Sequence, residues 1–138
     1  MRTGQGNKRM QNIRVLIVDD EEEVGEILSL RLKRRGIQPL VATSGALALK
    51  TLADSPVDVV LLDVKMPDMD GLTALAKIRA GFPDVAVIML SGHADMEAAT
   101  EGLQKGAFFY LLKPVDIDTL HNKIEDACEQ MALEQGRG

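Results

Sequence analysis

The stretch VDVVLLDVKMP, residues 57–67, is the part of this sequence that most constrains the fold. It begins with an apolar run, Val57 to Leu62, that is interrupted only by Asp58 and does not alternate with polar residues, which is typical of a strand covered on both faces. A carboxylate, Asp63, follows the run directly. Strands of this kind belong to parallel sheets with helices on both sides. The stretch therefore predicts an α/β fold with an acidic side chain at the end of a buried strand.

Further apolar runs alternate with helical segments along the chain. The other runs are Ile13 to Val18, Ile37 to Ala42, Val85 to Leu90 and Phe108 to Leu112. The predicted helices follow Asp20 up to Gly36 and then occupy 44–53, 71–80, 94–104 and the segment around 120–131. Such alternation requires right-handed crossovers between parallel strands. We therefore predict a three-layer α/β sandwich with a five-stranded parallel sheet and about five helices.

Two of these helices carry an apolar stripe. In the first, the stripe consists of Val24, Ile27 and Leu28. In the last, it consists of Leu120, Ile124, Ala127, Cys128 and Met131. This spacing places each set on one face of its helix, which we expect to contact the core. Cys128 is the only cysteine and is expected to be a small buried apolar residue.

Composition limits the class of protein. The chain has 138 residues, of which 46% are hydrophobic and 27% charged, as in one globular domain. No apolar run is long enough to span a membrane, and a net charge of -5 disfavours nucleic acid binding, so we expect a cytoplasmic protein with protein partners. We place the domain at 13–133, after a flexible lead-in at 1–12 and before a short tail at 134–138.

Polar side chains follow the predicted strands at their carboxyl ends. Asp19 and Asp20 come after the first strand, Asp63 after the third, Ser91 after the fourth and Lys113 after the fifth. In open parallel sheets, binding sites form beyond these ends, where the strand order reverses. We therefore expect three carboxylates, a hydroxyl group and an ammonium group to converge at one edge of the sheet.

These groups indicate a metal-assisted phosphoryl acceptor. Neighbouring carboxylates repel one another unless a cation lies between them, and oxygen ligands suit Mg²⁺, with Mn²⁺ as the alternative ion. The predicted ligands are Asp20, Asp63, the backbone carbonyl of Lys65, and Asp19 acting partly through water. Asp63 would be the nucleophile, and Lys113 and Ser91 would contact the phosphoryl oxygens. Without a phosphoryl group, Lys113 would pair with Asp63.

Single motifs have other interpretations. Asp20 stands before Glu21 at the start of a predicted helix and could be a helix cap only. Ser91 or Lys113, taken singly, could be an ordinary loop residue. The segment DMDG, residues 68–71, contains part of a calcium-loop pattern, but Lys77 stands where that pattern needs glutamate, so we interpret the segment as a turn.

Four motifs occur in a characteristic order: VLIVDDE at 15–21, LLDVKMP at 61–67 with Gly71, Ser91-Gly92, and YLLKP at 110–114. With them the chain resembles a response-regulator receiver domain of two-component signal transduction. The resemblance implies a doubly wound, flavodoxin-like fold with strand order 2-1-3-4-5. It implies phosphorylation of Asp63 by a histidine kinase or phosphotransfer protein, with Mg²⁺. It also implies a cis peptide bond between Lys113 and Pro114, and no enzymatic activity beyond self-phosphorylation from small donors and autodephosphorylation.

The same resemblance implies a conformational switch. Ser91 is similar to the family's switch hydroxyl, and Tyr110 to the aromatic residue that swings inward behind it. Partners, or a second copy in a dimer, would contact the face formed by the fourth helix, the fifth strand and the fifth helix. Lys65 and His93, two positions after Asp63 and Ser91, stand where residues tune the phosphoryl lifetime. We expect Lys65 to lengthen it.

Two other functions are alternatives. A small phosphohydrolase can use an aspartate nucleophile with a lysine and a hydroxyl, although Asp19 and Asp20 are adjacent here rather than two positions apart. A receiver-shaped module that is never phosphorylated would only bind proteins. Since the sequence ends soon after the last predicted helix, we expect either a single-domain regulator of a downstream protein or part of a longer protein with an output domain.

Overall fold

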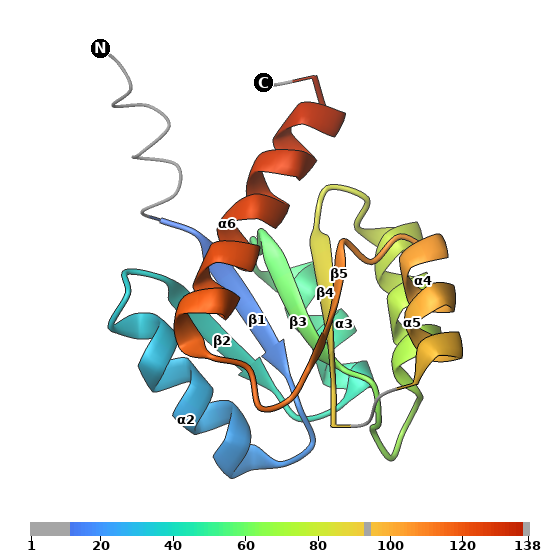
Figure 1. Ribbon diagram of the computed structural model, residues 1–138, viewed down its shortest axis with the longest axis horizontal. Coiled ribbons are helices and arrows are strands. Elements are labelled where there is room, and N and C mark those ends of the chain that lie inside the picture. The colour runs from blue at the N-terminus through green and yellow to red at the C-terminus, as the bar shows by residue number, and fades with distance from the viewer. Residues whose placement is uncertain (1–11, 93–94, 137–138) are drawn as a thin grey trace.

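A parallel sheet forms the centre of the molecule, with five strands in the order β2-β1-β3-β4-β5 (Figure 1). The computed structural model describes residues 12–92 and 95–136. The strands are β1 (Arg14–Val18), β2 (Gln38–Ala42), β3 (Val59–Asp63), β4 (Ala86–Ser91) and β5 (Phe109–Leu112), and all neighbours run parallel. The predicted flavodoxin-like strand order is confirmed.

Helices cover both faces of the sheet. They are α2 (Glu22–Lys33), α3 (Gly45–Asp54), α4 (Gly71–Gly81), α5 (Met96–Gln104) and α6 (Ile117–Glu134). α2 and α6 lie on one face, and α3 and α4 lie on the other, with α5 beside α4 and β5 (Figure 1). The predicted three-layer sandwich is thus confirmed. Among the described residues, no helix is both long and apolar enough to cross a membrane.

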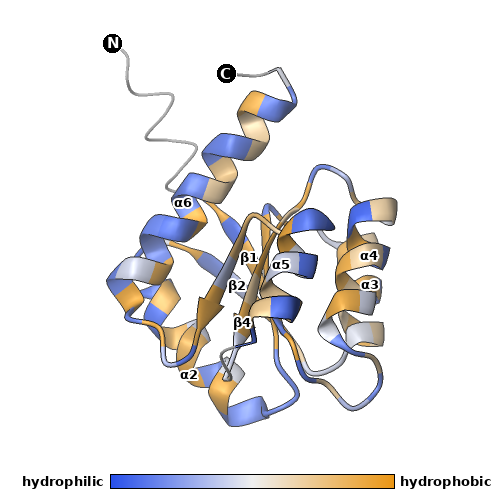
Figure 2. Cartoon of the chain, turned by 45° about the vertical axis from the view of Figure 1, so that its right-hand side comes forward, coloured by the Kyte–Doolittle hydropathy of each residue, from blue (hydrophilic) through white to orange (hydrophobic). Residues whose placement is uncertain are grey.

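The two faces of the central strands contribute to two separate cores. In β1, Val15 and Ile17 contact the core under α2 and α6, whereas Leu16 and Val18 contact the core under α3 and α4. This alternation follows from the two-residue period of a strand, and all four side chains are buried. Figure 2 shows largely hydrophobic strands between helices that carry both hydrophilic and hydrophobic residues. Burial on both faces explains why the apolar runs do not alternate with polar residues.

The predicted core stripe of α6 is confirmed. Asp116 caps the helix by accepting a hydrogen bond of 3.1 Å from the amide of Thr119. The buried residues of the helix then include Leu120, Ile124, Ala127 and Met131. Cys128 is half-buried and packs at the margin of the same core. The helix therefore lies on the sheet as its spacing predicts.

The predicted core face of α2 is wrong in part. Val24 is 37% exposed and Ile27 is 54% exposed, whereas Leu32 is fully buried. The cause is a close approach at Gly25, where a Cβ atom would lie 3.0 Å from Cγ1 of Val41 on β2. The helix therefore contacts the core through Gly25, Leu32 and, as predicted, Leu28. Val24 and Ile27 are left at the wall of a cavity instead.

The ends of the predicted domain are only partly within the described residues. α6 ends at Glu134, one residue beyond the predicted domain end. Of the predicted lead-in at 1–12, only Asn12 is described, and of the predicted tail only 134–136. The domain boundaries therefore stay a prediction.

Candidate functional site

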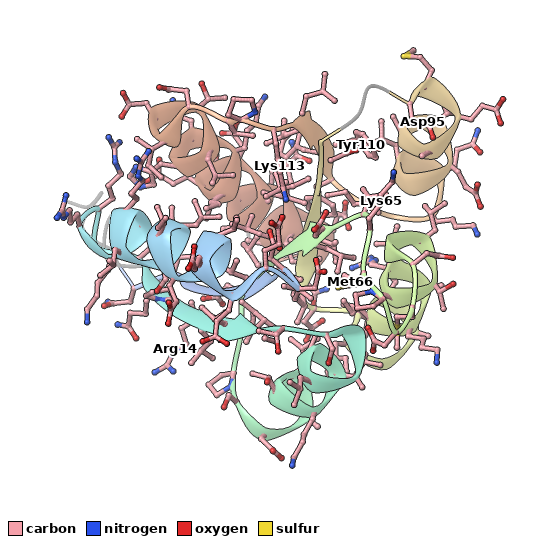
Figure 3. All side chains as sticks on the ribbon, turned by 90° about the horizontal axis from the view of Figure 1, so that it is seen from below. Arg14, Lys65, Met66, Asp95, Tyr110 and Lys113 are labelled. Carbon is pink, nitrogen blue, oxygen red and sulfur yellow. The ribbon has the colours of Figure 1, made fainter. Side chains whose placement is uncertain are left out.

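The strand register brings the predicted site residues to one edge of the sheet. β1 and β3 pair up to the residues before Asp19 and Asp63, so these two acids leave the sheet side by side. Asp63 pairs with the residue before Ser91 on β4. The amide of Lys113 donates a hydrogen bond of 2.7 Å to the carbonyl of Ser91. Figure 3 looks onto this edge and labels Lys113 there.

Asp19, Asp20 and Asp63 form an acidic cluster. Each has a carboxylate oxygen within 4.8 Å of the others. Asp19 is 4% exposed and Asp63 is 8% exposed, while Asp20 is open to solvent. Three carboxylates this close repel one another, and burial removes water that would screen the repulsion. The cluster could therefore hold a divalent cation, and its oxygen ligands suit a hard ion such as Mg²⁺.

Lys113 supplies positive charge beside this cluster. Its Nζ donates a hydrogen bond of 3.1 Å to Oδ2 of Asp19 and lies 3.6 Å from Oδ2 of Asp63. Burial disfavours its charge, but the hydrogen bond to Asp19 and the charge of Asp63 outweigh burial and raise the pKa of Lys113. The sequence predicted a pair with Asp63. In the structure the ammonium group is shared between the two acids and lies closer to Asp19.

The charge of Asp63 is unfavourable at this position. Burial raises the pKa of Asp63, the charge of Lys113 lowers it, and the charge of Asp19 raises it again. The amide of Lys65, 3.3 Å from Oδ1, lowers it slightly, and the net result is a raised pKa. An ionised carboxylate in such surroundings gains stability from a nearby cation, which favours metal binding here.

The helix-cap interpretation of Asp20 is wrong, because α2 has no side-chain cap. The residue before α2 is Glu21, whose side chain makes no capping hydrogen bond. The amide of Glu21 instead donates a hydrogen bond of 2.9 Å to Oδ1 of Asp19. Asp20 makes no such bond among the described residues, so its carboxylate is open to a cation.

A hollow of about 320 Å³ lies beside the acidic cluster. It is lined by Asp20, Val64, Lys65, Met66, Pro67 and Asp70. The amide of Val64 donates to the carbonyl of Leu90 over 3.0 Å, so this segment leaves β3 along the site. The segment that carries the predicted carbonyl ligand of Lys65 thus borders the same hollow as Asp20.

The predicted switch residues lie on β4 and on β5, the edge strand beside it. Ser91 is the buried last residue of β4. Tyr110 of β5, labelled in Figure 3, packs against the core under α3 and α4, and its hydroxyl is buried without a hydrogen-bond partner among the described residues. A rearrangement that gave this hydroxyl a partner would be favourable. The peptide bond between Lys113 and Pro114 is cis. The predicted tuning residue His93 lies outside the described residues.

Two acids in the segment predicted as a turn have defined partners. Asp70 caps α4 by accepting a hydrogen bond of 2.8 Å from the amide of Thr73. Asp68 accepts hydrogen bonds of 3.0 Å from the amides of Gly45 and Ala46 at the start of α3. These partners lie 23 and 22 residues before Asp68, so no local pattern in the sequence signals the contact.

A larger cavity of about 490 Å³ lies beside α2 and reaches the site. Its lining is mostly apolar and includes Val24, Ile27 and Val115. Asp63 and Lys113 also line it. An apolar surface therefore adjoins the charged groups, a feature that the sequence did not predict.

Comparisons with known proteins agree with this geometry. The family model of the response regulator receiver domain matches residues 15–125. The regulatory protein AtoC of Escherichia coli is 38% identical over 122 residues, which cover 88% of this chain and 26% of AtoC. A putative NtrX-like response regulator of Rickettsia bellii is 41% identical over 128 residues, which cover 91% of this chain and 27% of that protein. The chain thus spans about a quarter of the length of these curated relatives.

Solved structures have the same fold. A CheY-like receiver domain from Methanospirillum hungatei gives a TM-score of 0.83 at 30% identity and covers 88% of this chain and 98% of its own. The beryllofluoride-activated NtrC4 receiver domain dimer gives 0.81 at 36% identity, with 86% and 98% covered. Because the family model spans most of the residues and relatives of this identity share both sequence and fold, the chain belongs to the response regulator receiver domain family.

Proposed function

We propose that this domain accepts a phosphoryl group on Asp63 from the phosphohistidine of a histidine kinase or phosphotransfer protein. The observation that carries the proposal is the position of Asp63 at the end of β3. Its carboxylate lies within 4.8 Å of those of Asp19 and Asp20, and 3.6 Å from the ammonium group of Lys113. An oxygen nucleophile beside a metal site and a cation is what phosphoryl transfer needs.

In the proposed step, a carboxylate oxygen of Asp63 attacks phosphorus as the P–N bond of the phosphohistidine breaks. The bonding electrons leave with the imidazole, which takes up a proton from solvent. Lys113 already lies within reach of Asp63 and would contact the non-bridging oxygens, and Ser91 would donate a hydrogen bond to them. Mg²⁺ held by the acidic cluster and the carbonyl of Lys65 would neutralise charge on the phosphoryl group.

The cavity beside α2 supports docking of a protein donor next to Asp63. Val24 and Ile27 expose apolar surface in its wall, and apolar surface next to a charged reaction centre suits a protein that must present a phosphohistidine there. Approach from this side would bring the donor directly to the acceptor. A cytoplasmic location, where such donors act, is part of the same proposal.

The output face is proposed to be formed by α5, β5 and α6. Exposed apolar side chains on α5 and β5 are Met96, Leu103 and Leu112. Phosphorylation would draw Ser91 toward the phosphoryl oxygens, and Tyr110 would move with it, so that the face changes shape. The partner would be a downstream protein, an output domain in a longer chain, or a second copy, as in the NtrC4 receiver dimer.

Incubation with acetyl phosphate and Mg²⁺, followed by intact-mass measurement, tests the proposal. We expect the wild type to gain one phosphoryl group, and the Asp63→Asn variant or a sample with excess EDTA to gain none. An unmodified wild type, under conditions that label a known receiver domain, would refute the proposal. Repeated turnover of a phosphomonoester by the wild type would instead support the phosphohydrolase alternative.

A further inference from the structure

The side chain of Asp68 fastens the segment between β3 and α4, residues 64–70, to the start of α3. Its two carboxylate oxygens accept hydrogen bonds of 3.0 Å from the amides of Ala46 and Gly45. The next amide of the helix, that of Leu47, donates to Oγ of Ser44 over 3.1 Å. The first amides of a helix have no partner within it, so Asp68 and Ser44 together satisfy this helix end.

Electrostatics strengthen this contact. The hydrogen bonds from Ala46 and Gly45 lower the pKa of Asp68. The side chain is therefore a carboxylate at neutral pH, placed where the partial positive charge of a helix N-terminus favours an anion. An asparagine at this position would keep only one acceptor oxygen and lose the charge.

Close packing holds the same segment at two more points. A Cβ atom at Gly45 would lie 2.5 Å from Cγ of Met69, so Met69 packs directly on the start of α3. The amide of Gly71 donates a hydrogen bond of 2.7 Å to the carbonyl of Val64, and a Cβ atom at Gly71 would lie 2.7 Å from Cα of Val64. The segment is thus closed on itself at Gly71 and fixed to α3 by Asp68 and Met69.

This segment carries Lys65, whose backbone carbonyl is a proposed metal ligand. Val64, Met66 and Met69 are half-buried and pack against the core, whereas Lys65, Pro67 and Asp68 are exposed, so the exposed residues depend on hydrogen bonds for their position. Mg²⁺ demands ligands in nearly ideal octahedral positions, so a ligand on a loose segment would bind it poorly. We propose that Asp68 is a positioning residue that holds the carbonyl of Lys65 beside the acidic cluster and thereby sets the Mg²⁺ affinity of the site. The inference rests on the proposed function, which supplies the metal site.

Titration calorimetry with Mg²⁺ on the full chain tests this role. Asp68→Ala removes both hydrogen bonds and is expected to weaken Mg²⁺ binding about tenfold, the lower end of the range for residues that orient metal ligands. Asp68→Asn keeps one acceptor and should lose less. Ser44→Ala is the matched control, because it removes a hydrogen bond from the same helix end without touching the segment, and it should bind Mg²⁺ like the wild type.

The melting temperature without Mg²⁺ separates positioning from general stability, since Asp68→Ala and Ser44→Ala should both lower it while only the former weakens binding. Equal Mg²⁺ affinity in Asp68→Ala and wild type would overturn the role. The role would also be overturned if Asp68→Asn lost as much Mg²⁺ affinity as Asp68→Ala, because the effect would then come from the charge. A similar loss of Mg²⁺ affinity in Ser44→Ala would overturn it as well. If Asp68→Ala does not fold, Asp68→Asn against Ser44→Ala decides the question. If the wild type itself binds no Mg²⁺, the metal site fails and the inference fails with it, a result distinct from failure of positioning alone.

Discussion

Lys113 donates a hydrogen bond of 3.1 Å to Asp19, a residue 94 positions earlier in the chain. The contact joins the end of β5 to the end of β1, across the two strands between them. Asp19 and Asp63 are both buried, and Lys113 is the ammonium group within ion-pair distance of each. Without a bound metal, the ammonium group of Lys113 therefore offsets the repulsion between these two carboxylates.

Replacing Lys113 should affect stability and metal binding in opposite directions. Without Mg²⁺, Lys113→Met should lower the free energy of unfolding by on the order of 2 kcal/mol, less than for a fully buried pair because the side chain is partly exposed. Its Mg²⁺ affinity should rise, since a competing positive charge is gone. Thermal unfolding with and without Mg²⁺ measures both effects. Lys105→Met breaks an exposed pair with Glu101 and should cost at most about 0.5 kcal/mol. Equal stability of the two variants would contradict the prediction.

Asp20 should matter for the metal and little for the fold. Its side chain is exposed and does not cap α2, so Asp20→Ala should leave the melting temperature without Mg²⁺ nearly unchanged or slightly raised. Loss of a carboxylate ligand should weaken Mg²⁺ binding by about tenfold or more, as measured by calorimetry. Asp84→Ala, an exposed acid before β4, is the control and should bind Mg²⁺ like the wild type. Equal affinity in both variants would mean that Asp20 is not a ligand.

The stability contribution of Asp63 should depend on pH. Its pKa is raised in the folded protein from the ordinary value of 3.8, mainly by burial. A carboxyl group shifted in this direction destabilises the folded state above its folded pKa, and the cost disappears as the pH falls through that pKa to below the unfolded value. Without Mg²⁺ at neutral pH, Asp63→Asn should therefore be more stable than the wild type, by on the order of 1 kcal/mol. Thermal unfolding across the acid range should show the two proteins converging, and a gap that widens toward low pH would refute the prediction.

Two helical glycines should respond to alanine with opposite signs. A Cβ atom at Gly102 on α5 would lie 2.8 Å from Sδ of Met89, which is fully buried in β4. Overpacking should outweigh the gain in helix propensity, so Gly102→Ala should cost about 1–2 kcal/mol. At Gly81, the end of α4, nothing lies within 4 Å of such an atom, and Gly81→Ala should add up to about 1 kcal/mol. Denaturant unfolding measures the change in the free energy of unfolding of both variants. If both variants gained stability, helix propensity alone would account for the effects and the prediction would be wrong.

The fold was predictable because the pattern of apolar residues within each short segment indicates a buried strand. The runs that became β1, β3 and β4 are apolar except for Arg14 and Asp58, and burial on both faces of a parallel sheet favours this pattern. The face of α2 was not predictable in the same way. The orientation of α2 depends on the close contact between Gly25 and Val41 of β2. The spacing of apolar residues along a helix does not predict the shape of the surface on which the helix packs. Val24 and Ile27 therefore line a cavity, although their spacing fits a core face.

The site was predictable as far as it follows from strand ends. Asp19, Asp63, Ser91 and Lys113 each come directly after or at the end of a strand, and parallel register alone brings them together. The position of Lys113 nearer to Asp19 than to Asp63 depends on side-chain geometry that register does not fix. The contact of Asp68 with α3 depends on how two helices pack on one face of the sheet. No pattern in the sequence contains that information.

The side chain and the backbone of Lys65 should have separable effects. Lys65 is exposed beside Asp63, at the edge of the sheet that Figure 3 shows, and its ammonium group would shield a phosphoryl group on Asp63 from water. Lys65→Ala should therefore speed loss of the phosphoryl group several-fold. The rate is measured by intact mass after acetyl phosphate has been removed. Lys77→Ala, an exposed lysine on α4, is the control and should not change the rate. An unchanged or slower loss in Lys65→Ala would contradict the shielding role. Because alanine keeps the backbone carbonyl, the Mg²⁺ affinity of Lys65→Ala should stay close to that of the wild type. This result would separate the shielding role of the side chain from the metal-binding role of the backbone carbonyl.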